Sequence, residues 1–296
     1  MHRALAAWFV EHPWRTAIIT ACLSVLLLLG AIPLVVLVAA IPALMMLEHG
    51  PRASLNAMLA GSAAIVGTTV GFQQSFWFGL AYASMLFVLP LLLSELLRRY
   101  GSLQLVFQAV LLLALLVLGV VFAVLPHPTD VWQEPLTQSM VMLQRADIKI
   151  DATLFDYWVR SMWGAVVALL MLVSFSAVLL ARWWQSLLHA PGEFGKEFRS
   201  LSAGVALTSV LAVICVASLF TDFAWLDSLA QVAVIGLALQ GLAVAHRRKA
   251  EGRLRRGWLV TIYVLLVATL SSSVTVALLA VWGLVDFWRR TRMSAA

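Results

Sequence analysis

Polar residues that could bind a small molecule occur in two groups at the ends of apolar segments. One group closes the segment "LNAMLAGSAAIVGTTVGF", and the other lies in acidic stretches further along the chain. A small-solute site needs a few hydroxyl, amide, carboxylate or indole groups that converge on an otherwise apolar cavity. We therefore predict that the ligand-binding residues are Thr68, Thr69, Gln73, Gln74, Trp77, Asp156, Asp222, Trp225 and Asp227.

The two glutamines give this prediction a geometric test. An amide buried in hydrocarbon without a partner is strongly unfavourable. If the site is internal, Gln73 or Gln74 is expected to face the interior of the helical bundle, close to one of the acids.

Catalytic and metal-binding motifs are missing from the sequence. It contains no G-x-S-x-G, Walker loop, H-E-x-x-H or acidic metal cluster, and its six histidines are scattered. Cys22 and Cys215 lie in separate apolar runs, which favours packing over a disulfide framework. We predict that the chain is not an enzyme and has no metal or cofactor.

A dense basic segment, "HRRKAEGRLRRG" from His246 to Gly257, allows two interpretations. Such a run could bind nucleic acid, or it could mark the cytoplasmic side of a membrane. The composition favours the membrane, because the chain is 62% hydrophobic and 11% charged. A soluble domain carries about 25% charged residues. The segment is also short and lacks interleaved aromatic residues, so we predict lipid contact and no nucleic acid as a partner.

Several apolar runs approach the roughly 20 residues that a helix needs to cross hydrocarbon. The clear spans are Leu55–Phe72, Phe76–Leu97, Leu103–Leu125, Trp158–Leu180, Leu201–Phe220 and Leu226–Ala245. Two longer stretches are ambiguous, Ala17–Leu47 and Trp258–Phe287. Gly30 and Pro33 favour dividing the first into two helices, and the serine-rich centre at Ser271–Thr275 favours dividing the second less strongly.

The charged residues predict the topology, because arginine and lysine in short connections stay on the cytoplasmic side. Successive connections alternate between basic and acidic. We predict an all-α polytopic bundle of eight to ten passes, favouring ten, with both termini cytoplasmic. Residues 1–296 would form one integral membrane domain, with an extracytoplasmic loop at 127–157 that includes an amphipathic segment, and cytoplasmic loops at 182–200 and 246–257.

Two local features predict contacts between and along the helices. Gly67 and Gly71 have the G-x-x-x-G spacing that permits close helix packing in membranes. Glu95 and Asp286 each precede arginines by three and four residues, a spacing that predicts ion pairs along one helix face. The expected partners are Arg98 and Arg99 for Glu95, and Arg289 and Arg290 for Asp286.

Several stretches resemble a known family. They are "RWWQSLLHAPGEFGKEFRSL", "GLALQGLAVAHRRK", "WGLVDFWRR" and "IPALMMLEHGP". With these the chain resembles the YybS-like family of predicted bacterial membrane proteins of unknown function. That family is thought to be distantly similar to the substrate-binding subunits of energy-coupling-factor transporters. The resemblance implies an inner-membrane protein that binds a small molecule near its outer face, with possible partner subunits.

Two main functions remain open from the sequence, with a lipid-handling role as a third, weaker alternative. The chain could bind or help transport a small solute through an outward-facing helical pocket. Alternatively, it could be a non-transporting scaffold or assembly protein that acts through its cytoplasmic loops. Both place it in the bacterial inner membrane, in contact with the lipid bilayer.

Overall fold

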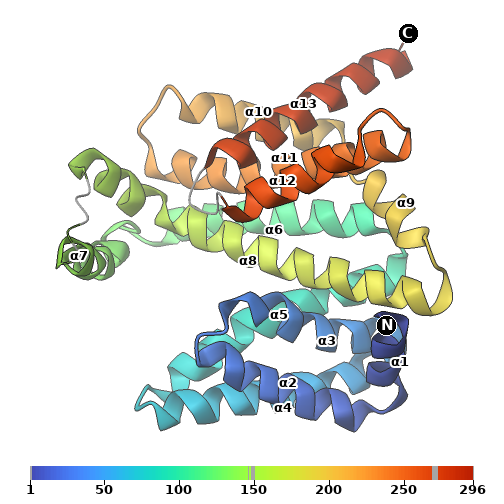
Figure 1. Ribbon diagram of the computed structural model, residues 1–296. Helices are drawn as coiled ribbons and strands as arrows, with labels where there is room; N and C mark the ends of the chain where they lie inside the picture. The colour runs from blue at the N-terminus through green and yellow to red at the C-terminus, as the bar shows by residue number, and fades with distance from the viewer. Residues whose placement is uncertain (1, 146, 148–150, 269–272, 296) are drawn as a thin grey trace. The chain divides into compact units, whose positions relative to one another are not determined.

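A computed structural model describes the whole chain except residues 1, 146, 148–150, 269–272 and 296. The described residues form helices and connections, with no strand among them (Figure 1). Six helices are long and apolar enough to cross a membrane, which indicates a multi-pass membrane protein. They are Ile32–His49, Pro51–Gly71, Phe76–Tyr100, Leu103–Val124, Ala152–His189 and Ala224–Ala250.

The chain divides into two compact units, each described here by itself. The first consists of Met1–Val110 and Leu170–Phe198, and the second of Leu111–Leu169 and Arg199–Ala296. Helices α6 (Leu103–Val124) and α8 (Ala152–His189) contribute residues to both units. Helix α8 is longer than the predicted span, because it includes residues that we had assigned to the loops on either side.

The first unit contains the first ambiguous stretch, which divides as predicted. Helix α2 (Pro13–Leu28) is separated from α3 (Val35–His49) by a turn and the short helix η1 (Ile32–Leu34). Gly30 takes a positive φ of 103°, a backbone conformation that glycine adopts without steric cost. This unit also contains α1 (His2–Glu11), α4 (Pro51–Gly71), α5 (Phe76–Tyr100) and α9 (Glu193–Arg199), of which the last residue, Arg199, belongs to the second unit.

Close helix packing in the first unit uses other glycines than the predicted pair. A Cβ added at Gly67 or Gly71 would meet open space, so the predicted G-x-x-x-G contact is wrong. A Cβ at Gly61 would lie 2.7 Å from Phe87 and 2.8 Å from Thr20. Gly61 therefore lets α4 approach both α2 and α5.

The predicted pairing of Glu95 is confirmed at the end of α5. Its carboxylate lies 2.7 Å from the Arg98 Nε and 2.5 Å from the Arg99 Nε. The next turn ends the helix at Gly101, which has a φ of 63°. A left-handed glycine is a common helix terminator.

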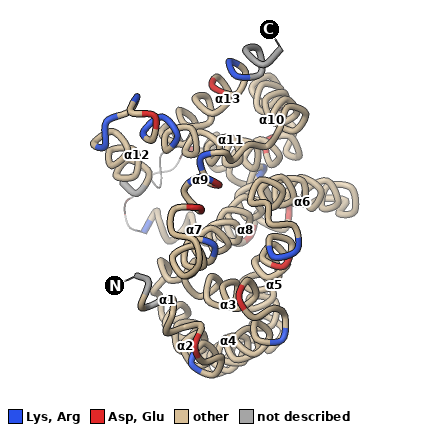
Figure 2. The backbone as a smooth tube through the Cα atoms, turned by 90° about the vertical axis from the view of Figure 1, so that its right-hand side faces the viewer, with Lys and Arg blue, Asp and Glu red and all other residues tan. Residues whose placement is uncertain are grey.

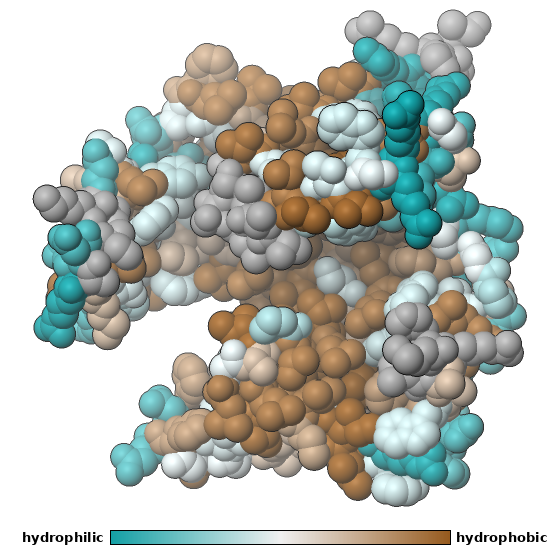
Figure 3. All heavy atoms as spheres, viewed as in Figure 1, coloured by the Kyte–Doolittle hydropathy of each residue, from teal (hydrophilic) through white to brown (hydrophobic). Residues whose placement is uncertain are grey.

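The second unit contains α7 (Asp130–Arg145), α10 (Val205–Ser218), α11 (Ala224–Ala250), α12 (Arg256–Ala268) and α13 (Ser273–Ala295). The second ambiguous stretch therefore also forms two helices. The predicted reversal at Ser271 and Ser272 lies outside the described residues. On the face seen in Figure 3, hydrophobic side chains gather over the middle of this unit, and hydrophilic side chains gather where α11 passes into α12.

Helices α11 and α13 pack side by side with their backbones in close contact (Figure 1). A Cβ at Gly241 would overlap the Leu279 carbonyl oxygen, and a Cβ at Gly283 would lie 2.6 Å from the Leu237 carbonyl oxygen. Gly241 and Gly283 also meet each other, and further toward the C-terminus of both helices Arg247 pairs with Asp286. From the glycine contact to this ion pair both helices advance toward their C-termini, so they run parallel.

A basic cluster terminates this helix pair. Asp286, almost fully buried, pairs with Arg247, with Arg248 at 2.9 Å and with Arg290 at 3.1 Å. The predicted pairing with Arg290 is confirmed, and the two arginines of α11 were not anticipated. Figure 2 shows further basic residues on the connection between α11 and α12 and near the end of α13.

Candidate functional site

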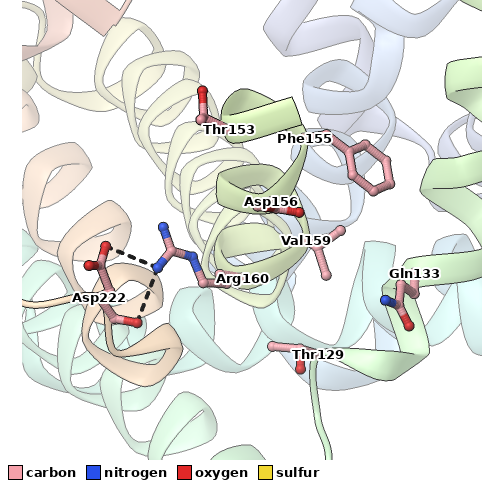
Figure 4. Close-up of a pocket in the computed structure, with 8 residues that line it drawn as sticks. All are labelled: Thr129, Gln133, Thr153, Phe155, Asp156, Val159, Arg160 and Asp222. Carbon is pink, nitrogen blue, oxygen red and sulfur yellow. Dashed lines mark hydrogen bonds and ion pairs between the residues drawn. The ribbon is translucent and has the colours of Figure 1, made fainter. Parts of the chain in front are cut away.

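A polar pocket opens in the second unit where α7, α8 and the connection before α11 meet (Figure 4). Its volume is about 620 Å³, within the roughly 300–1,000 Å³ of small-molecule sites. The lining includes a guanidinium, two carboxylates, two hydroxyls and an amide. The lining residues are Thr129, Gln133, Thr153, Phe155, Asp156, Val159, Arg160 and Asp222.

Arg160 is the central charged group of the pocket. Its Nη1 donates to the Asp222 carboxylate at 3.0 Å and to the Asp222 carbonyl oxygen at 3.2 Å. Figure 4 shows both bonds, which tie α8 to the connection between α10 and α11. The Arg160 Nε is buried and has no hydrogen-bond partner among the described residues. A buried donor in this state favours an acceptor from a ligand or water.

A third carboxylate lies beside this ion pair. Asp227, in the first turn of α11, is buried and close enough to Arg160 and Asp222 to interact electrostatically with both. Ser228 next to it donates to the Arg160 carbonyl oxygen at 3.4 Å. A Cβ at Gly164 would overlap the Ser228 backbone. The close approach of α8 and α11 at Gly164 therefore sets the position of Arg160 among the acids.

Helix α7 forms the facing wall through Gln133, with Thr129 just before its first residue. The Trp163 indole of α8 donates to the Pro128 carbonyl oxygen at 2.7 Å. The rings of Trp163 and Trp132 also meet edge to face, with centroids 5.3 Å apart. One hydrogen bond and one aromatic pair thus hold the start of α7 against α8.

The rim of the pocket contains the N-terminal cap of α8. The Asp151 carboxylate accepts from both the amide and the hydroxyl of Thr153, each at 2.7 Å. These bonds stabilise the charged form, so the Thr153 hydroxyl and amide lower the pKa of Asp151 below its usual value. Asp151 is therefore a negative charge bonded to the pocket-lining Thr153.

Comparison with family models, curated proteins and solved structures finds no match. The site therefore has to be interpreted from its own geometry. No group of three His, Cys, Asp or Glu side chains among the described residues could hold a metal ion. The arrangement is one of charge recognition, in which two carboxylates and one guanidinium line an open cavity.

The predicted site residues fall in different parts of the chain. Asp156 and Asp222 line the pocket, and Asp227 interacts electrostatically with its ion pair. Trp225 is exposed at the start of α11 and stacks on Phe223, with centroids 6.3 Å apart.

The remaining predicted residues lie in the first unit, around the end of α4 and the start of α5. Thr68 and Thr69 donate to carbonyl oxygens of their own helix at 2.7 and 2.9 Å. Gln73 and Gln74 are exposed, so neither faces the interior of the bundle as we had predicted. Trp77 is exposed as well. This group does not contribute to the pocket in the second unit.

The sequence analysis missed the residue on which the pocket is centred. Arg160 begins the apolar part of α8, in "YWVRSMWGAVVALL", and was counted as part of a membrane span. A lone arginine at the acidic end of such a helix was a usable signal, because a charge near hydrocarbon requires a partner. The contributions of Thr129 and Gln133 depend on how α7 folds back, which no local pattern predicts.

Proposed function

We propose that this chain is a multi-pass membrane protein that binds a small polar solute in the pocket around Arg160. The observation that carries the proposal is the buried Arg160 Nε, which has no acceptor among the described residues and lies in a polar cavity. Buried polar groups in folded proteins nearly always have partners. A bound solute with an oxygen acceptor would supply the missing one.

The charges around Arg160 support a solute class. Asp156, Asp222 and Asp227 provide three carboxylates against one guanidinium, so the site has an excess of negative charge. A cationic amine would balance that excess, while an oxygen of the solute would accept from Arg160. We therefore propose a small zwitterion, carrying an amine and an oxygen anion, as the solute.

The proposed orientation places this pocket on the extracytoplasmic side. It lies near the start of α11, and the basic cluster lies near the end, with Asp227 and Arg247 20 residues or about 30 Å of helix apart. That length matches the roughly 30 Å of a hydrocarbon core. Because basic residues favour the cytoplasmic side, the pocket would face outward and both termini inward.

The ten-pass count belongs to the same proposal. Besides the six long helices, shorter apolar helices span Pro13–Leu28, Val205–Ser218 and Arg256–Leu266. With α13 they complete ten crossings. The resemblance to YybS-like proteins supports a bacterial inner membrane and partner subunits that would supply energy, because the sequence has no Walker loop of its own.

A thermal-shift experiment on purified protein tests the solute proposal. The probes are glycine, ethanolamine and phosphoethanolamine, compared with acetate and glycerol. A zwitterion at 100 times its Kd should stabilise the folded state by about 2.7 kcal/mol. We expect one of the zwitterions to raise the melting temperature of the wild type but not of Asp156→Asn with Asp222→Asn.

The matched control is Glu134→Gln with Asp147→Asn, which removes the same charge from the acidic segment outside the pocket lining. A zwitterion should raise the melting temperature of this control variant as it does that of the wild type. Stabilisation of the pocket variant equal to that of wild type would refute binding at this site. Absence of a response to every probe would favour the scaffold alternative.

Cysteine labelling tests the orientation separately. Asp147→Cys and Glu251→Cys would each be introduced into a chain lacking Cys22 and Cys215. An impermeant maleimide applied to intact cells should label position 147 and spare position 251. Equal labelling of both positions would contradict the proposed topology.

A further inference from the structure

The basic cluster at the ends of α11 and α13 carries more positive charge than its internal partner can balance. Asp286 pairs with Arg247, Arg248 and Arg290, and Glu251 lies within 4.0 Å of Arg247 and Arg253, so four arginines share two carboxylates. The side chains of Arg248 and Arg290 are 31% and 45% exposed. Guanidinium groups that are this accessible can still bind an anion from outside.

The structure also limits how far the cluster can rearrange. Arg247 donates to the Arg199 carbonyl oxygen at 3.3 Å as well as to Asp286, and its side chain is only 16% exposed. Gln240 donates to the Gly283 carbonyl oxygen at 3.4 Å and accepts from the Ala203 amide at 3.1 Å. Close backbone packing and these bonds hold α11 and α13 in register. The arginines are therefore preorganised around Asp286.

The surroundings of the cluster indicate the depth at which it lies. Trp288 is exposed two residues before Arg290, and Trp258 is exposed two residues after Arg256. Exposed tryptophans at helix ends are typical of the boundary between hydrocarbon and headgroups. Exposed apolar side chains lie nearby on α12 and α13, including Val260, Val281 and Val285. An anion reaching Arg248 and Arg290 would therefore be at the level of lipid phosphates.

We infer that this basic cluster is a specific site for the phosphate of an anionic phospholipid. Arg248 and Arg290 would bind the phosphate oxygens, and Arg247 would hold Asp286 in place. The acyl chains would lie against the exposed apolar surfaces of α12 and α13. This site is separate from the proposed solute pocket, at the opposite end of α11, and does not depend on it.

Native mass spectrometry with added lipid tests the inference. Phosphatidylglycerol and phosphatidylcholine would be titrated separately into the delipidated full-length protein. Each basic residue near an anionic surface contributes roughly five-fold in affinity, so losing two should weaken binding about 25-fold. We expect the wild type to retain phosphatidylglycerol in preference to phosphatidylcholine, and Arg248→Gln with Arg290→Gln to lose that preference.

Two further variants separate a specific site from general attraction. Arg98→Gln with Arg99→Gln removes the same charge at the end of α5 and should leave binding unchanged. Arg248→Lys with Arg290→Lys keeps the charge and should restore much of the binding. Equal losses in both glutamine pairs would overturn the inference, as would unchanged binding in both.

Soluble anions distinguish a lipid from a free phosphate. Millimolar glycerol phosphate or inorganic phosphate should not displace the bound phosphatidylglycerol, because neither has acyl chains to contact the apolar surface. Displacement at these concentrations would identify a general phosphate site and overturn the assignment to a lipid.

Discussion

At the start of α11 one arginine, Arg160, lies among three carboxylates, whereas at its end Arg247, Arg248 and Arg290 surround the carboxylate of Asp286, with Glu251 4.0 Å from Arg247. Carboxylates outnumber the guanidinium at one end, and guanidiniums outnumber the carboxylates at the other. Asp227 stands in the first turn of α11, and Arg247 and Arg248 in its last. The helix dipole favours this order, with acids at the N-terminus and bases at the C-terminus.

The two ends of α11 differ more in the sign of their excess charge than in their ion pairs. Each cluster has an internal pair that fixes its geometry, and each has charge left over. The excess is negative in the wide pocket and positive beside the exposed tryptophans. We therefore expect opposite ligands at the two ends of one helix.

The largest effect should come from removing the buried carboxylate of the basic cluster. Asp286→Asn removes the negative charge that Arg247, Arg248 and Arg290 share and leaves only Glu251, among the described residues, beside Arg247. Breaking a buried ion pair costs about 3–5 kcal/mol, and partial exposure of the arginines places the expected loss near the lower limit. Equilibrium unfolding in lipid measures it. Asp147→Asn, an exposed acid, is the control, and equal stability of the two variants would contradict the account.

Two glycine substitutions should each lower the stability of the protein by an intermediate amount, and each should affect ligand binding at one end of α11. Gly241→Ala pushes a methyl group into the Leu279 carbonyl, and Gly164→Ala pushes one into the Ser228 backbone. Overpacking costs about 1–3 kcal/mol. The first variant should weaken lipid binding, and the second should weaken solute binding.

The control for both variants is Gly67→Ala, which adds a methyl group in a helix where nothing lies within 4 Å. Alanine is the better helix former, so this variant should be neutral or more stable by up to about 1 kcal/mol. Melting temperatures of the three variants would give their order of stability. A Gly67→Ala protein as unstable as the other two would contradict the packing account.

Arg160→Gln should change stability little and binding strongly. Its partner Asp222 has a side chain that is 90% exposed, and an ion pair of this kind contributes less than about 1 kcal/mol. The response to a zwitterion in the thermal-shift experiment should nevertheless disappear. Arg145→Gln, at the exposed end of α7, should keep the response. A large loss of stability in Arg160→Gln would show that the arginine mainly supports the fold.

The smallest effect concerns the rim of the pocket. Thr153→Val removes the hydroxyl that donates to Asp151 and keeps the amide donor, so the pKa of Asp151 should rise part of the way to its usual value. A carboxyl with a lowered pKa stabilises the fold above its unfolded pKa, and that stability is lost as the pH falls through the lowered value. Carboxyl NMR on labelled protein measures the shift. An unchanged pKa would show that the hydroxyl contributes nothing.

Part of this architecture could be predicted from the sequence, because it depends on residues that are close together along the chain. Gly30 and Pro33 break the first long apolar stretch, and the spacing of Glu95 from Arg98 and Arg99 specifies their pairing within one helix. The all-helical class follows from composition and from the length of the apolar runs.

The rest depends on which helices meet. Nothing near Asp286 in the sequence indicates that Arg247 would pair with it, because that contact requires the parallel packing of α11 on α13. Arg160 and Asp222 are likewise brought together by the return of the chain through α10. Gly67 and Gly71 had the expected spacing but no helix opposite them, which shows that a motif for packing does not specify a partner.

The attachment of α7 has a consequence for how the protein is handled. This helix carries one wall of the pocket, and among the described residues its start is held by a hydrogen bond from Trp163 to Pro128 and by the Trp132–Trp163 ring pair. Its own exposed Val131 and Met142 share a face, suited to resting on a bilayer surface. Lipid thickness and lateral pressure would then act on the pocket directly. Solute affinities measured in detergent micelles and in planar bilayers should differ, and the bilayer value is the one relevant to the cell.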